Sequence, residues 1–339
     1  MSLKFVNEVS KEEFIAFNDI AFPERDNKQL IYFRYYNVRI NHSERIREEN
    51  IFILDPNGEI LAQSLYHPAS YYFKGETENI QWGFDLYVRQ DKRKDSLGLR
   101  LMEHIAATKS TNIFASGVGE KALKVEKYFG YHVVGNLYKY YKIINPLYFL
   151  SGLMLKEDLV SDKFPSLVCG KLGKYKKIDI SKISNLPQPY NTDLLEFGRD
   201  KHFLQWRFAS GLFNYVTYSL DNERSELVEN YFVVRTIKYK GVTCLVLVDY
   251  RCNIRNKNAI RNIISVVNII AQKLLIPIVV TGSSLKKIDE VLCELGYRTT
   301  GIPRPIVCND EALRSYKDPI QSRRFVLSTL ADSDGEYTL

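Results

Sequence analysis

The sequence predicts a mixed α/β protein built from two similar units in series. Short apolar runs alternate with stretches of helical spacing through both halves of the chain. Turn residues separate several of the apolar runs, as they do between strands. The length of 339 residues exceeds what one hydrophobic core usually needs, so about two domains are expected.

The first half predicts helix, hairpin, strand, helix, strand, helix and strand in that order. Residues 11–22 have the apolar spacing of a helix. Two apolar runs joined by Asp55-Pro56-Asn57-Gly58 predict a hairpin over 51–66. The remaining elements are expected as a strand over 79–88, a helix over 96–108, a strand over 112–116, a helix over 119–129 and a strand over 131–144.

The strand over 79–88 alternates with period two, which is typical of a strand whose two faces differ. The alternation predicts one face made of Trp82, Phe84, Leu86 and Val88. It places Gln81, Gly83, Asp85 and Tyr87 on the other face.

Prolines and glycines interrupt this rhythm after residue 144, so we place a linker at 146–170. The expected domains are therefore 1–145 and 171–330. The second half repeats the order with a strand over 175–183, a helix over 193–209, a strand over 214–220 and two strands within 229–250 joined by a turn at Tyr239-Lys240-Gly241. A helix over 257–274, a strand over 276–281, a helix over 284–295 and a last strand over 297–307 follow.

Composition and motifs exclude several classes of function. Five cysteines without a C-x-x-C pair favour neither a zinc ribbon nor a disulfide framework, and the histidines lack metal-ligand spacing, so no metal is expected. No nucleophile elbow or Walker loop occurs. The net charge of +7 is modest and suits a small anionic ligand, with no nucleic-acid partner expected. We find neither a signal peptide nor a run long enough to cross a bilayer, which predicts a cytoplasmic protein without a membrane partner.

Residues 113–135 have the outline of a dinucleotide-binding turn. Gly117, Gly119 and Ala122 supply G-x-G-x-x-A between a strand and a helix. A dinucleotide site also needs an acidic residue about 20 positions later, at the end of the next strand. Residues 134–136 are Val, Gly and Asn, and the turn follows a hairpin rather than opening a parallel sheet. The pattern therefore disfavours a dinucleotide site.

A second strand-to-helix turn, at residues 89–98, is better suited to a phosphate group. A strand ends at Val88, a basic loop follows, and a helix begins near Ser96 with Gly98 in its first turn. Free amides at a helix N-terminus bind phosphate oxygens, and a small residue lets a pyrophosphate approach the backbone. Arg93 and Lys94 add positive charge. The alternative is a packing glycine beside a solvated basic loop.

The order of these elements, with the motifs on them, resembles the GNAT N-acyltransferase superfamily over about residues 1–144. Residues 93–98, Arg93-Lys94-Asp95-Ser96-Leu97-Gly98, match its acetyl-CoA motif Q/R-x-x-G-x-G/A, with Ser96 in place of the first glycine. Ala122 and Gly130-Tyr131 match its A-x-x-x-Y-E-K-x-G-F ending, where Glu126 stands in place of the tyrosine general acid. The resemblance implies a largely antiparallel central sheet with helices on both faces.

The second half resembles the same superfamily more faintly. Residues 202–215 are similar to the W-R-F/Y stretch of tandem GNAT and Fem-type proteins, which implies two GNAT-like domains in tandem. After the central strand, Asn256, Lys257 and Asn258 stand where a glycine-containing turn belongs, so the second domain is expected to be degenerate. We therefore expect one CoA per chain, bound by the first half. Trp206 and Arg207 either contact the acceptor substrate or have only structural roles, as an aromatic core residue and a surface arginine of an amphipathic helix.

The resemblance implies an N-acetyltransferase that moves an acetyl group from acetyl-CoA to a primary amine of a small molecule, such as an amino sugar or amino-acid derivative. It implies that Asp85 is the candidate base and that Glu126 is an altered acid or acts through water. The alternatives are a strand-surface carboxylate in an ion pair for Asp85 and a solvated helix-face carboxylate for Glu126. The implied acetyl-CoA contacts are the backbone of Leu86, Tyr87 and Val88, together with residues 93–98.

Two other functions stay open. A Fem-type aminoacyl transferase would use charged tRNA and would need a helical-arm insertion, which we do not find in the sequence. A non-catalytic acyl-CoA-binding protein is suggested by Ser96 and Glu126, because both depart from the family's motifs.

Overall fold

The computed structural model describes residues 2–5, 9–23, 51–108, 111–155, 163–180, 191, 193–209, 211, 213–220, 230–239, 241–316 and 325–332. The chain forms two compact units. Unit 1 comprises Met1–Tyr71, Thr77–Val134 and Pro305–Asp318, and unit 2 comprises Tyr72–Glu76, Gly135–Arg304 and Pro319–Leu339. The domain boundaries expected from the sequence, 1–145 and 171–330 with a linker at 146–170, stay a prediction.

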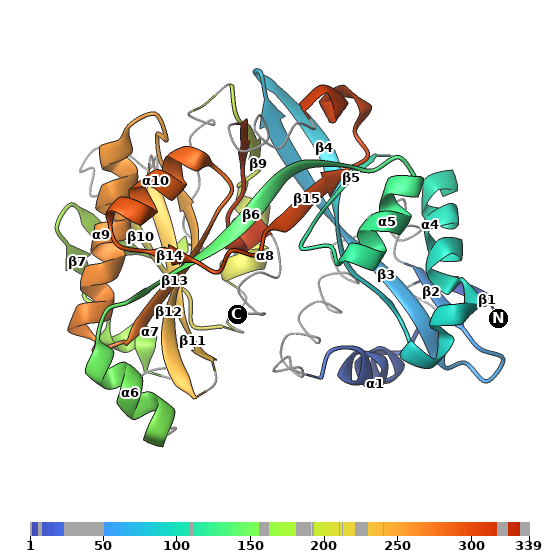
Figure 1. Cartoon of the computed structure of the whole chain (residues 1–339), viewed down its shortest axis with the longest axis horizontal. Coiled ribbons are helices and arrows are strands. Elements are labelled where there is room, and N and C mark those ends of the chain that lie inside the picture. The colour runs from blue at the N-terminus through green and yellow to red at the C-terminus, as the bar shows by residue number, and fades with distance from the viewer. Residues whose placement is uncertain are drawn as a thin grey trace. The chain divides into compact units, whose positions relative to one another are not determined.

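Unit 1 is built on a mixed sheet (Figure 1). Its strands follow the spatial order β1 (Ser2–Phe5), β2 (Ile51–Leu54), β3 (Ile60–Phe73), β4 (Glu76–Val88), β5 (Asn112–Ser116) and β15 (Arg304–Cys308). The pairs β1–β2, β2–β3 and β5–β15 are antiparallel, and β4–β5 is parallel. The predicted hairpin is confirmed, because Asp55 Oδ1 accepts hydrogen bonds from the backbone amides of Asn57 and Glu59 in its turn.

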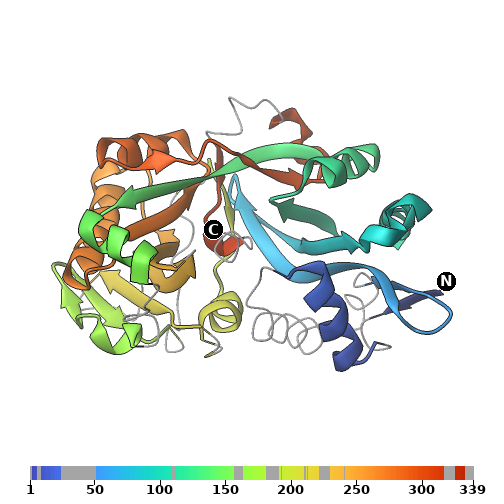
Figure 2. The ribbon, with the colours of Figure 1, turned by 60° about the horizontal axis from the view of Figure 1, so that its bottom comes forward.

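Helices cover both faces of this sheet (Figure 2). Helix α1 (Lys11–Ala21) buries Phe14 and Phe17 against one face, and it begins with a capping box of Ser10 and Glu13. Helices α4 (Leu97–Thr108) and α5 (Glu120–Tyr128) pack on the opposite face. The alternation along β2 assigns its residues to the two cores, since Ile51 and Ile53 belong to one and Phe52 and Leu54 to the other.

The predicted single apolar face of β4 is wrong beyond Phe84. Phe84 and Tyr87 pack on the α1 side of the sheet, whereas Leu86 and Val88 pack on the α4 side. Asp85, between them, has the left-handed backbone angle φ = 52°. A left-handed residue within a strand is typical of a bulge, which shifts the alternation by one residue. Aspartate tolerates this conformation better than most side chains do.

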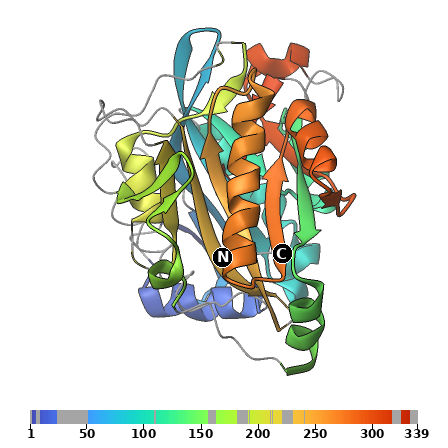
Figure 3. The same ribbon diagram turned by 90° about the vertical axis from the view of Figure 1, so that its left-hand side faces the viewer.

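Unit 2 repeats the architecture with a larger sheet. Its strands follow the order β7 (Lys171–Leu172), β8 (Tyr175–Ile178), β10 (Val216–Leu220), β11 (Tyr231–Tyr239), β12 (Val242–Arg251), β13 (Ile278–Ser283) and β6 (His132–Ile143), with β14 (Arg298–Thr299) also on β6. Only β12–β13 is parallel among the pairs with a described register in this sheet. Helices α9 (Lys257–Lys273) and α10 (Lys286–Glu294) pack on it, with α9 lying along the strands (Figure 3).

The segment 146–170, expected as a linker, contains helices α6 (Pro146–Leu155) and α7 (Phe164–Leu167) among its described residues. One predicted helix of this half is wrong in detail. The helix expected over 193–209 is instead strand β9 (Leu195–Phe197) followed by helix α8 (Lys201–Phe208), which Asp200 caps. Strand β9 pairs in parallel with β16 (Val326–Leu327), a partner 131 residues away that local spacing cannot reveal.

The last predicted strand, over 297–307, is also divided. Its first part is β14 on β6, and its second part is β15 on β5 of unit 1. Gly301, with φ = 78°, and Pro303 lie between these parts and interrupt the strand. The predicted class, a largely antiparallel mixed sheet with helices, is confirmed for both units. In the described part of the chain, each helix is too short or too polar to span a membrane.

Candidate functional site

The turn after β4 has the conformation that the phosphate-binding interpretation requires. The chain passes through a 3-10 helix, η2 (Gln90–Asp95), and α4 begins at Leu97, which confirms the expected helix start near Ser96. Ser96 has φ = 57°, a left-handed conformation that glycine adopts most easily. Glycine at this position of the motif would permit the same left-handed backbone. Ser96 therefore adopts the conformation that the motif's glycine would have.

The start of α4 offers free amides. The first helical hydrogen bond runs from the amide of Arg100 to the carbonyl oxygen of Ser96, at 3.1 Å. The amides of Leu97, Gly98 and Leu99 therefore come before the hydrogen-bonded part of the helix. A Cβ atom added to Gly98 would contact only Val88 Cγ2, at 3.5 Å. Packing does not demand glycine here, so the packing interpretation loses its support.

Two positive side chains precede these amides in the turn. Arg93 and Lys94 are exposed, and Arg93 turns back toward β4. Its Nε donates a hydrogen bond to the carbonyl oxygen of Val88 at 3.3 Å, and its guanidinium carbon lies 5.5 Å from the centre of the Tyr87 ring. Asp95 is also exposed, whereas the side chain of Leu97 is buried in the core, so only the backbone of Leu97 is available to a ligand.

The end of β4 extends past its partner strand. The parallel register of β4 and β5 runs from Ile80–Asn112 to Gly83–Ala115. Asp85 lies two residues beyond the last pair, half-buried, and the strand continues to Val88. Among the described residues, the register with β5 therefore ends before the last part of β4, which runs on to Val88. The structure thus brings the predicted residues 85–88 next to the predicted turn over 93–98.

Glu126 is buried, which overturns the interpretation of a solvated helix-face carboxylate. Its residue is 6% exposed, on the side of α5 where Leu123 and Phe129 pack on the core. Its Oε2 atom has no hydrogen-bond partner among the described residues. Burial raises the pKa of Glu126 to about 8, so the side chain is a neutral acid at pH 7.

This burial predicts how stability changes with pH. Between pH 4.5 and about 8 the folded chain keeps a proton on Glu126 that the unfolded chain releases, so the free energy of unfolding falls as the pH rises. From pH 4.5 to pH 7 the expected loss is about 3 kcal/mol. Glu126→Gln removes this dependence, as measured by chemical denaturation at several pH values. The control is Glu120→Gln on the exposed side of α5. Equal slopes for Glu126→Gln and wild type would contradict the burial.

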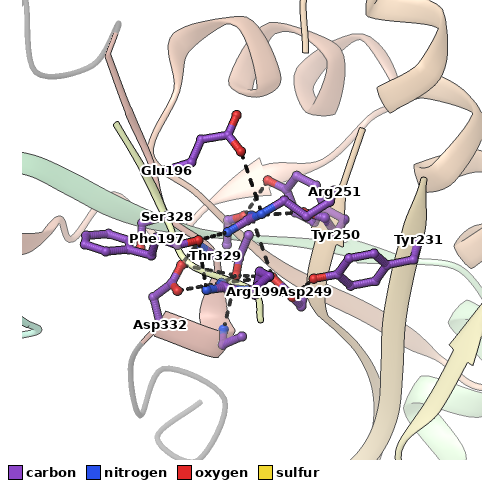
Figure 4. Close-up of polar contacts among 12 residues, drawn as sticks. Glu196, Phe197, Arg199, Tyr231, Asp249, Tyr250, Arg251, Ser328, Thr329 and Asp332 are labelled. Atoms are coloured by element: carbon purple, nitrogen blue, oxygen red, sulfur yellow. Dashed lines mark hydrogen bonds and ion pairs between the residues drawn. The ribbon is translucent and has the colours of Figure 1, made fainter. Parts of the chain in front are cut away.

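The corresponding position of unit 2 holds a closed polar network (Figure 4). The parallel pairing of β12 with β13 ends at Leu247–Thr281, and Asp249 lies two residues later, as Asp85 does after Gly83. Asp249 is 0% exposed. It accepts hydrogen bonds from Arg199 Nε at 3.0 Å, Tyr231 Oη at 2.8 Å and Thr329 Oγ1 at 2.7 Å.

Arg199 also binds Asp332, at 2.5 Å, and Arg251 lies between Asp249 and Glu196, 3.9 and 4.0 Å away. Burial alone would raise the pKa of Asp249, but the charges of Arg199 and Arg251, with the hydrogen bonds, lower it instead. Local sequence patterns do not mark this network, because its members come from segments far apart in the chain. No local motif marks Arg199.

The start of α9 also differs from the start of α4. Asn256 Oδ1 accepts a hydrogen bond from the amide of Asn258 at 3.0 Å, so a side chain already occupies this helix terminus. Lys257 forms an ion pair with Glu290 at 2.8 Å. The side chains of Asn256 and Lys257, which stand where a glycine-containing turn was expected, therefore have partners within the protein.

The remaining predicted groups have structural partners. Arg207 is buried and donates hydrogen bonds to the carbonyl oxygen of Ala331 at 3.2 Å and to Tyr215 Oη at 3.0 Å, which suits the core interpretation. Within the described ranges, no group of three or more His, Cys, Asp or Glu residues is arranged to hold a metal ion.

Proteins of known structure share the fold of this chain. No protein-family model and no curated protein matches the chain. Solved structures do match, across 91% of this chain. One is Saccharomyces cerevisiae N-myristoyltransferase with bound myristoyl-CoA and inhibitors, at 11% identity and TM-score 0.61 over 80% of that chain.

Two further solved structures also match. A GCN5-related N-acetyltransferase from Anabaena variabilis matches at 10% identity and TM-score 0.59 over 72% of its length. A probable N-acyltransferase from Enterococcus faecalis matches at 11% identity and TM-score 0.53 over 71%. At these identities the likeness shows the fold alone, and that fold is the one that the sequence resemblance implied. The chain has the fold of the GNAT N-acyltransferase superfamily.

Proposed function

We propose that this chain is an N-acyltransferase that uses an acyl-CoA, with acetyl-CoA as the expected donor, and acts on a primary amine of a small molecule. The observation that carries this proposal is the turn after β4. It combines a left-handed Ser96, the free amides of residues 97–99 and an open position at Gly98. The fold shared with known acyltransferases supports the same interpretation.

The described residues fit the anionic part of CoA. A pyrophosphate would accept hydrogen bonds from the amides of Leu97, Gly98 and Leu99, where the helix dipole favours negative charge. Arg93 and Lys94 would add charge-assisted contacts. The pantetheine amides would pair with the β4 edge over 86–88, in the way that a peptide strand adds to a sheet.

The chemistry assigned to this chain is direct transfer. Acyl-CoA supplies the activated thioester. Asp85 takes the proton that the amine loses as its nitrogen bonds to the carbonyl carbon, directly or through water. A backbone amide of residues 86–88 polarises that carbonyl. Glu126, protonated at pH 7, supplies a proton to the sulfur when the carbon–sulfur bond breaks.

Gly98→Glu tests the cofactor site. The variant puts bulk and negative charge where the pyrophosphate lies, so acetyl-CoA affinity is expected to fall about 100-fold or more. Gly98→Ala is the matched control, because a Cβ atom has room at this position. Titration calorimetry of the intact chain measures both variants, and wild type should bind one CoA per chain.

Unchanged acetyl-CoA affinity in folded Gly98→Glu would contradict this site, as would two equivalent sites per chain. Comparing acetyl-CoA with myristoyl-CoA decides the acyl chain, because one similar structure holds the latter. An assay of thiol release with a panel of amines then separates catalysis from binding alone. Binding of charged tRNA in place of acyl-CoA would favour the Fem-type alternative.

A further inference from the structure

Unit 2 contains a cavity of about 320 Å³ at the carboxyl ends of the parallel strands β12 and β13. The loop after β12, the start of α10 and the residues Asn191, Asp193 and Leu194 line it. In α/β sheets this edge is where ligands bind, and the volume is at the lower end for small-molecule sites. Asp249 and the capping residue Asn256 do not line this cavity. The chemistry of a ligand that fits the cavity therefore follows from the residues that line it.

The charges of the lining favour an anion. Asp193 is paired with Arg255 at 2.6 Å, and Glu290 is paired with Lys257 at 2.8 Å. The cavity also has Lys286 and Lys287 in its lining. Among the described residues no acidic side chain forms an ion pair with either lysine. The two carboxylates are thus neutralised, and the two lysine charges remain.

The start of α10 adds backbone donors at the same place. Leu285 precedes the helix without a side-chain cap, in contrast to Asn256 at α9. The amides of Ile288 and Asp289 both bond to the carbonyl oxygen of Leu285, at 3.0 Å. The amides of Lys286 and Lys287 therefore lie before the first helical bonds, at the positive end of the helix dipole.

Asn191 gives an independent indication of a ligand. It lines the cavity, and its residue is 1% exposed. Its Nδ2 donates a hydrogen bond to Glu196 Oε1 at 2.8 Å, which fixes the orientation of the amide because a carboxylate only accepts. Its Oδ1 then has no donor among the described residues. A buried acceptor without a donor is costly, so a ligand group with an N–H or O–H would stabilise it.

We propose that this cavity binds a small organic anion: a carboxylate or phosphate held by Lys286, Lys287 and the start of α10, with an N–H or O–H donor directed to Asn191 Oδ1. This site is separate from the turn after β4 and does not depend on acyl transfer. The cavity differs from the proposed CoA site of unit 1 in its lining, which brings two lysines and Asn191 together.

Calorimetric titration of the intact chain tests the proposal with three probes: N-acetylglycine, acetate and inorganic phosphate. N-acetylglycine has a carboxylate and an amide N–H, and is expected to bind with a dissociation constant on the order of 1 mM. Acetate lacks the donor, so it should bind about tenfold more weakly. Phosphate shows whether the site prefers this anion to a carboxylate.

Variants separate the two parts of the site. Lys287→Glu should abolish binding of every probe, whereas Lys273→Glu, the same change on an exposed lysine at the end of α9, should leave it intact. Asn191→Leu should remove the preference for N-acetylglycine over acetate. If that variant does not fold, the comparison of the two probes on wild type carries the same test.

No binding by any probe, or equal loss in Lys287→Glu and Lys273→Glu, would overturn the proposal. Equal affinity for N-acetylglycine and acetate would overturn the role of Asn191. Gly98→Glu should leave anion binding unchanged, so failure of the proposed CoA site and failure of this site are distinguishable.

Discussion

Arg199→Ala is expected to lower the free energy of unfolding by about 3–5 kcal/mol. The guanidinium is 5% exposed and bridges two buried carboxylates, Asp249 and Asp332. Removing it leaves both acids in the interior without their cation, and the penalty for an uncompensated buried charge is large. Denaturant unfolding followed by circular dichroism measures the change.

The control for this prediction is Arg261→Ala. Arg261 forms an ion pair with Glu294 between α9 and α10, and both side chains are more than 40% exposed. Water screens such a pair, so its loss should cost about 1 kcal/mol or less. If the two variants lose equal stability, the Asp249 network does not hold unit 2 together in the way the contacts imply.

Asp85→Asn is expected to lower kcat by about 10²–10⁴. The amide cannot take a proton from the amine, yet asparagine tolerates the left-handed backbone that this position imposes. The fold and the acetyl-CoA affinity should therefore stay close to wild type. The wild-type rate should rise with pH as the base and the amine lose their protons. In Asp85→Asn, the contribution of the base to this pH dependence should be absent.

Glu103→Gln provides the matched change, since Glu103 is an exposed carboxylate on α4. It should leave kcat unaltered. A folded Asp85→Asn variant with the wild-type rate across the pH range would show that Asp85 is merely structural. If kcat and acetyl-CoA affinity fall together in Asp85→Asn, the residue shapes the binding site rather than the proton transfer.

Local patterns predicted much of unit 1. The hairpin at Asp55 and the helix start near Ser96 follow from short-range rules of turns and helix termini, and the structure has both. The structure also leaves room beside Gly98, where the sequence has a small residue. The path of β4 could not be predicted in the same way. The sequence alternates regularly, but the left-handed turn at Asp85 moves Leu86 and Val88 to the other face.

Local patterns also could not predict the burial and protonation of the carboxyl groups. Glu126 lies in a helix with lysines beside it in sequence, which suggested a solvated position. Its side chain points into the core because α5 packs with that face inward, and only this packing makes it a neutral acid. Asp249 stands in an apolar strand, and only the tertiary structure places Arg199 beside it.

The sequence by itself determined the α/β class, most helices and strands, and the motif after β4, because these depend on neighbours within a few residues. The tertiary structure alone decided the pairing of β9 with β16, the burial of Glu126, the network at Asp249 and the cavity at α10. Each of these depends on packing or pairing between segments distant in the chain. Their free energies come from contacts and desolvation, which a linear pattern does not contain.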